Sequence, residues 1–135
     1  MSAQTRADLL LTAAALAYLA GALPLVFAPD EVLRALGEDP SPLAALVAQL
    51  AGAALFGFAM LDWMSRGSLI GGIYGRPLVV ANLAHAFIAA IALGRHALDQ
   101  PIGPAILVAL AVYAALAIGF GYKLFATPAA ATRGE

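Results

Sequence analysis

The chain has 135 residues, of which 63% are hydrophobic and only 11% are charged, and its mean hydropathy is +0.91. Soluble domains are about half apolar and about one-quarter charged, so this composition excludes an ordinary water-soluble domain. The net charge of -1 and the lack of any run of like charges argue against a nucleic-acid partner. Because the chain has no cysteine, disulfides, thiolate nucleophiles and cysteine-ligated metals are excluded.

Four apolar stretches are long enough to cross a bilayer, for which a helix needs about 20 residues. They cover residues 7–28, 42–64, 77–97 and 102–125. Pro42, Pro77 and Pro104 stand at or near the expected helix starts, where a missing N–H costs little. The sequence therefore predicts a single all-α integral membrane domain over residues 1–135, built as an up-down bundle of four transmembrane helices.

The first span contains Pro24, so we expect this helix to kink or to end early near its outer end. Arg6, the apolar run from Leu9 and the small residues 20–22 also resemble a secretory signal peptide. Apolarity continues through Phe27, which is longer than a usual signal core and favours a retained helix.

The connection between the first and second spans predicts a short amphipathic helix in the first outer loop. Asp30 is placed to cap this helix, and Gly37 is placed to end it. Its apolar side is formed by Val32, Leu33 and Leu36. We interpret the segment as an interfacial helix that covers the bundle, in preference to a lid over a ligand.

The placement of lysine and arginine predicts the orientation, because cytoplasmic loops of membrane proteins carry an excess of these residues. With both termini in the cytoplasm, that side holds five basic residues and the opposite side holds two. The two sets are Arg6, Arg66, Arg76, Lys123 and Arg133 against Arg34 and Arg95. We therefore expect a multi-pass protein of the cell membrane with cytoplasmic N- and C-termini. The alanine-rich composition is typical of a bacterial inner membrane.

Five polar side chains are expected near the middle of the spans, where each costs free energy unless it finds a partner or water. They are Tyr18, Gln49, Asn82, His85 and Tyr113. One interpretation is a binding level for a small or amphipathic ligand, or a proton-accepting group, since histidine titrates near neutral pH. The alternative is that these groups only hydrogen-bond between helices. A lone histidine gives a poor metal site, so no metal or other cofactor is predicted.

Asp62 is the only carboxylate near the interior of a span, and Arg66 is its i+4 neighbour. An ion pair at the helix end with Arg66 or Arg76 would account for Asp62 without any further function. The other interpretation makes Asp62, Arg66 and Arg76 a cytoplasmic-side polar patch that recognises a lipid headgroup or a protein partner.

Small residues recur four apart on three of the expected helices, a pattern typical of contact surfaces between membrane helices. The sets are Ala13, Ala17 and Gly21; Ala44, Ala48 and Gly52; and Ala111, Ala115 and Gly119. The pattern predicts packing between helices or between subunits. The expected partners are therefore membrane lipids and either further copies of this chain or another membrane protein.

Three segments of the chain have a familiar pattern: LVFAPDEVL at the end of the first span, QLAGAALFGFAMLDWMSRG in the second and RPLVVANLAHAF in the third. In these segments the chain resembles small bacterial four-helix membrane proteins, including the DoxX-like group. The likeness lies in helix number, helix size and the style of the turns. It implies an architecture and carries over no functional residue.

Three functions remain open from the sequence. The first is a small non-enzymatic membrane protein that acts through helix association, as an accessory subunit or a homo-oligomer. The second is a bundle that binds a quinone, lipid or pigment at the mid-membrane polar level. The third is an oligomeric transporter or channel. No nucleophile or general base stands with a recognisable partner, so no enzymatic activity is predicted.

Overall fold

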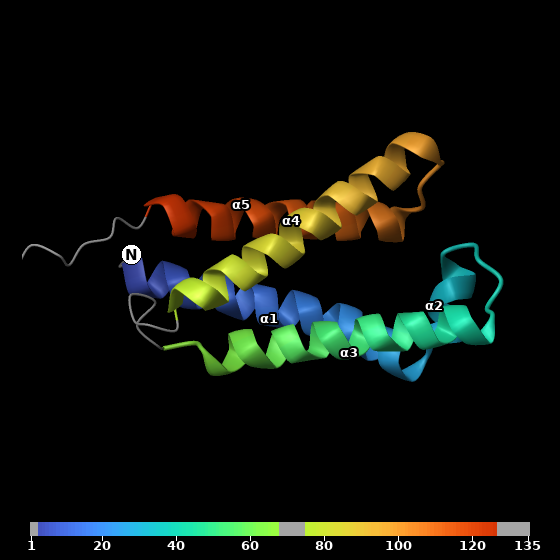
Figure 1. Ribbon diagram of the computed structural model, residues 1–135, viewed down its shortest axis with the longest axis horizontal. Coiled ribbons are helices and arrows are strands. Elements are labelled where there is room, and N and C mark those ends of the chain that lie inside the picture. Colours follow the sequence, from blue (N-terminus) through green and yellow to red (C-terminus); the bar gives the residue numbers. More distant parts are fainter. Residues whose placement is uncertain (1–2, 68–74, 127–135) are drawn as a thin grey trace, which may run out of the picture.

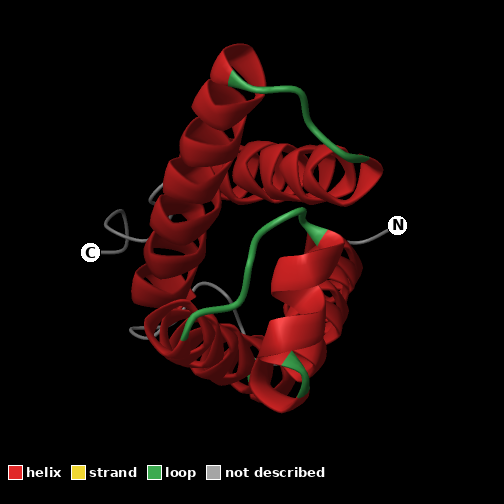
Figure 2. Cartoon of the chain, turned by 90° about the vertical axis from the view of Figure 1, so that its right-hand side faces the viewer, coloured by secondary structure: helices red, strands yellow, loops and turns green. Residues whose placement is uncertain are grey.

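The computed structural model describes residues 3–67 and 75–126 (Figure 1). Within these ranges the chain forms helices joined by short loops, and none of the described residues lies in a strand (Figures 1 and 2). The helices are α1 (Ala3–Phe27), α2 (Pro29–Ala35), α3 (Pro42–Met64), α4 (Gly75–Asp99) and α5 (Pro104–Ala126).

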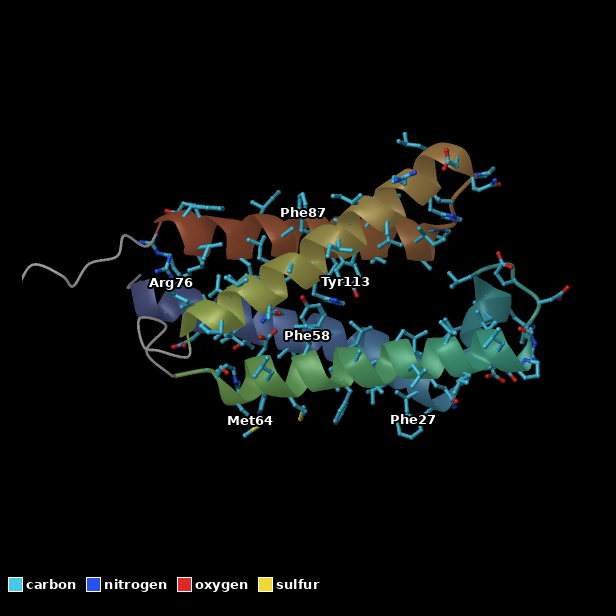
Figure 3. All side chains as sticks on the ribbon, viewed as in Figure 1. Phe27, Phe58, Met64, Arg76, Phe87 and Tyr113 are labelled. Carbon is cyan, nitrogen blue, oxygen red and sulfur yellow. The ribbon has the colours of Figure 1, made fainter. Side chains whose placement is uncertain are left out.

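Four of these helices, α1, α3, α4 and α5, are long and apolar enough to cross a membrane. They correspond to the four predicted spans, and the largest offset is at the start of α1, which begins at Ala3 and not at residue 7. Large apolar side chains point away from the bundle, as Phe27 and Met64 do in Figure 3. Such outward apolar surface suits hydrocarbon as its solvent, so the chain folds as a small multi-pass integral membrane protein.

The bundle consists of two helix pairs, because α1 packs along α3 and α4 packs along α5 (Figure 1). We call the end where α1 begins and α5 ends the termini end, and the opposite end the turn end. Among the described side chains, those buried in α4 lie at or before Ala86, and those buried in α5 are Leu116 and Phe120. The shared core therefore lies toward the termini end, and the two pairs diverge toward the turn end.

The first span does not end early at its proline, because α1 continues through Pro24 to Phe27. The prediction that Asp30 caps the following helix is wrong. Helix α2 begins two residues earlier than such a cap would require, at Pro29, whose fixed backbone angle suits the first helical position. Asp30 therefore lies in the first turn, where a negative charge is favourable near the positive end of the helix dipole. Gly37 follows the helix with a φ of 87°, a backbone conformation that favours glycine.

The small residues of α3 allow α1 and α3 to approach closely. A Cβ atom added at Gly52 would lie 2.8 Å from Leu25 Cβ and 3.0 Å from the backbone N of Val26. Ala48, one turn before Gly52, is also buried. On α5, a Cβ at Gly119 would lie 2.8 Å from the Leu10 side chain, so α5 also lies against α1. These two small-residue sets are thus used, at least in part, for packing inside the chain.

Substitution of Gly52 by alanine is expected to destabilise the bundle by about 1–3 kcal/mol, because the new Cβ overlaps backbone that cannot move alone. The matched control is Gly57→Ala on the same helix, since a Cβ there meets nothing within 4 Å. Thermal unfolding of the purified variants in mild detergent measures the difference. Equal unfolding temperatures for the two variants would contradict the close approach of α1 and α3.

Candidate functional site

Four aromatic rings meet where the two helix pairs begin to diverge, and we call them the ring cluster: Tyr18, Phe58, His85 and Tyr113. The rings of Phe58 and His85 are stacked, with centroids 4.7 Å apart and an interplanar angle of 19°. His85 makes edge contacts with Tyr18 at 5.4 Å and with Tyr113 at 5.6 Å. Contacts of this geometry are favourable in addition to the area that they bury. His85 is therefore the central ring of the cluster.

Each helix pair supplies two rings to the cluster. Tyr18 on α1 and Phe58 on α3 face His85 on α4 and Tyr113 on α5. Figure 3 places Phe58 and Tyr113 in the space between the two pairs. The ring cluster thus forms the seam between the pairs at this level. Any separation of the pairs would part the Phe58 and His85 rings.

A buried carboxyl–amide pair lies beside the ring cluster, toward the termini end. Asp62 on α3 and Asn82 on α4 are both 0% exposed. Asn82 Nδ2 donates a hydrogen bond of 2.7 Å to Asp62 Oδ1 and a second one of 3.2 Å to the backbone oxygen of Leu78. The first bond links the two helix pairs directly. A hydrogen bond to a charged or strongly polar group of this kind is worth most where water is excluded.

Four buried polar atoms at this seam have no hydrogen-bond partner within the described part of the protein. They are Tyr18 OH, Asp62 Oδ2, Asn82 Oδ1 and His85 Nε2. Each such atom costs about 1–3 kcal/mol relative to a satisfied one. Natural proteins rarely leave several such atoms together. The seam therefore presents four buried hydrogen-bonding atoms that are available to a further partner.

The structure brings together four of the five polar residues predicted for the middle of the spans, since Asn82 lies three residues from His85 on one helix face. Gln49 does not join them. Its side chain is exposed, and Nε2 donates a 3.3 Å hydrogen bond to the backbone oxygen of Val26. Val26 lies in the last turn of α1, where carbonyl groups lack helical partners. Gln49 therefore satisfies the end of α1 and does not reach the ring cluster.

The predicted patch of Asp62, Arg66 and Arg76 is not assembled among the described side chains. Asp62 accepts a hydrogen bond from Asn82, and within the described residues it forms no ion pair with either arginine. The Arg66 guanidinium lies 3.1 Å above the Trp63 ring, and its Nε donates to the Trp63 backbone oxygen. Arg76 is exposed. The predicted ion pair is wrong because Asp62 turns into the bundle while the arginines stay at its surface.

Phe58 and the Asp62–Asn82 pairing were missed from the sequence, although a signal exists for both. Phe58 and Asp62 are four apart on α3, and Asn82 and His85 are three apart on α4. Each helix thus carries a polar group and a ring on one face, one turn apart. Because consecutive spans run antiparallel, these two faces can meet with ring opposite ring.

The described residues contain no group of three or more His, Asp or Glu side chains that could hold a metal ion.

No protein family, no curated protein and no solved structure matches this chain. The resemblance to DoxX-like proteins therefore stays a prediction about architecture. The candidate site depends on the geometry of the seam alone.

Replacement of Asn82 by leucine is expected to destabilise the protein by about 1–3 kcal/mol, because it leaves the Asp62 carboxyl group buried without its hydrogen-bond partner. The double variant Asp62→Leu with Asn82→Leu removes both polar groups and should regain a large part of that loss. Unfolding of the single and double variants in the same detergent measures the coupling. Additive losses in the double variant would show that the two residues do not act as a pair.

Proposed function

We propose that this small integral membrane protein binds a flat, lipid-soluble molecule with hydrogen-bonding oxygens, such as a quinone, at the seam between its two helix pairs. The observation that carries the proposal is the ring cluster with its two unpartnered polar atoms, Tyr18 OH and His85 Nε2. A bundle interior lined by rings and a few polar groups is a common form of small-molecule site.

The chemistry of the ring cluster suits a flat conjugated molecule. The stacked Phe58 and His85 rings come from opposite helix pairs, so a planar ligand could insert between them and stack on both faces. The Tyr18 hydroxyl is a hydrogen-bond donor, and His85 Nε2 is a donor or an acceptor according to its tautomer. Carbonyl or hydroxyl oxygens of the ligand would satisfy both atoms. A purely apolar lipid would leave them unpaired.

The route to the ring cluster runs from the turn end. Among the described side chains, none is buried in α4 after Ala86 or in α5 before Leu116. His85 and Tyr113 lie at this boundary and are themselves only half-buried, while Tyr18 is 2% exposed. A hydrophobic molecule that diffuses in the bilayer would therefore reach His85 and Tyr113 first. Parting of the helix pairs would then admit it to Tyr18.

Assembly into a homo-oligomer or with another membrane protein is a second proposal, which the surface of α5 favours. Ala111 and Ala115 belong to the small-residue set of that helix and are exposed, whereas Gly119 of the same set packs against Leu10. The exposed part of the set is free for a second helix.

We also propose cytoplasmic termini, because the predicted cytoplasmic side carries the excess of basic residues.

Native mass spectrometry of the protein released from nanodiscs is expected to show a retained small-molecule mass. His85→Ala and Tyr18→Phe should each weaken retention, and also titrated binding of a short-tailed benzoquinone, by about 10-fold, since each removes one hydrogen bond from a buried ligand.

The matched controls for this measurement are His96→Ala and Tyr122→Phe, which alter the same residue types at exposed positions. These variants should bind as the unsubstituted protein does. No retained mass and no benzoquinone binding would reject the binding proposal. A stable oligomer without ligand in the same spectra would favour assembly as the function to pursue.

A further inference from the structure

The buried carboxyl–amide pair has an incomplete hydrogen-bond pattern that the binding proposal does not use. Asn82 Nδ2 already donates both of its hydrogens, to Asp62 Oδ1 and to the Leu78 backbone oxygen. The two remaining oxygens, Asp62 Oδ2 and Asn82 Oδ1, are buried and unpartnered. Both atoms are acceptors when the carboxyl group is ionised. Rotation of the Asn82 amide would not help, because its two hydrogens are committed.

We propose that Asp62 is a proton-binding site in which a proton on Oδ2 is shared with Asn82 Oδ1. A carboxylic acid and a primary amide form a cyclic pair, with the amide N–H on one carboxyl oxygen and the acid O–H on the amide oxygen. The first half of this ring is the 2.7 Å bond from Asn82 to Asp62. One proton added to the carboxylate completes the second half. That single proton satisfies both leftover acceptors and neutralises the buried charge.

The surroundings of Asp62 offer no other means of neutralising it among the described side chains. Arg66, on the same helix, is held over Trp63, and Arg76 on α4 is exposed. Tyr18 on α1 is close enough to Asp62 for an electrostatic interaction, and its ring contacts those of His85 on α4 and Tyr113 on α5. None of these three side chains hydrogen-bonds to Asp62. An isolated charge buried in this way is far more costly than a protonated carboxyl group.

The proposed proton lies between the two helix pairs, so its binding affects how strongly the pairs are held together. Asp62 belongs to one helix pair and Asn82 to the other, so the completed ring joins the pairs by two hydrogen bonds. Loss of the proton leaves two acceptor oxygens of adjacent groups facing a dry interior, which weakens the joint. Protonation of Asp62 therefore favours the closed seam, and deprotonation favours its opening.

Infrared spectroscopy of the full-length protein in nanodiscs tests this proposal, because a protonated carboxyl group has a carbonyl band distinct from that of a carboxylate. The measurement is made at about pH 5.5, still well above the ordinary aspartate pKa of about 3.9, where exposed aspartates are ionised. We expect one protonated-carboxyl band that shifts when the aspartates carry a 13C-labelled carboxyl group. The band should also shift in heavy water. This part of the test needs no substitution and so does not depend on the folding of a variant.

Three variants assign the band. Asp62→Asn should abolish it, and Asp39→Asn, an exposed aspartate in the loop before α3, should leave it unchanged. Asn82→Leu should move the band to the frequency of a carboxyl group without a hydrogen-bond partner, which a merely structural aspartate would not show. The absence of a protonated-carboxyl band, or its persistence in Asp62→Asn, overturns the proposal.

Discussion

The hydrogen bond between Asn82 and Asp62 is the interaction on which the arrangement of the two helix pairs most depends. In hydrocarbon, apolar helix surfaces gain little by leaving lipid for one another, so close packing and polar contacts must hold the bundle together. Close packing serves within the α1–α3 pair, where Gly52 lets the backbones approach. Between the pairs, α1 contacts α5 over a short region. The hydrogen bond from Asn82 on α4 to Asp62 on α3 joins the two pairs at the termini end. Water cannot substitute for it there, because both residues are fully buried.

The same bond fixes the position of the ring cluster. Phe58 is one turn from Asp62 on α3, and His85 is nearly one turn from Asn82 on α4. Once the polar groups are joined, the two rings must face each other across the seam, and they stack with centroids 4.7 Å apart. Tyr18 and Tyr113 complete the cluster from the remaining helices. The candidate site is therefore a consequence of a structural contact, placed where the shared core ends.

The two helix pairs pack together at the seam although some of its buried polar atoms have no hydrogen-bond partner in the described part of the chain. Ring stacking favours closure, whereas unpartnered atoms such as Tyr18 OH and His85 Nε2 oppose it. A ligand whose oxygens hydrogen-bond to these atoms removes the cost of leaving them unpartnered at the ring cluster. A proton on Asp62 removes the corresponding cost at the carboxyl–amide pair. The two proposals thus concern neighbouring parts of one interface between helix pairs. Each would act by satisfying polar atoms that the protein alone leaves without partners.

The sequence by itself determined the four spans, because span length and apolarity follow from bilayer thickness and prolines mark the helix starts. It also identified the polar side chains that a membrane interior makes costly. Only the tertiary structure decided which of them meet. Gln49 was expected at the site, but its side chain hydrogen-bonds to the end of α1. Asp62 was expected to form an ion pair with an arginine, but it accepts a hydrogen bond from Asn82. The physical reason is that helical periodicity gives the face of each residue, whereas the rotation and offset of one helix against another depend on packing.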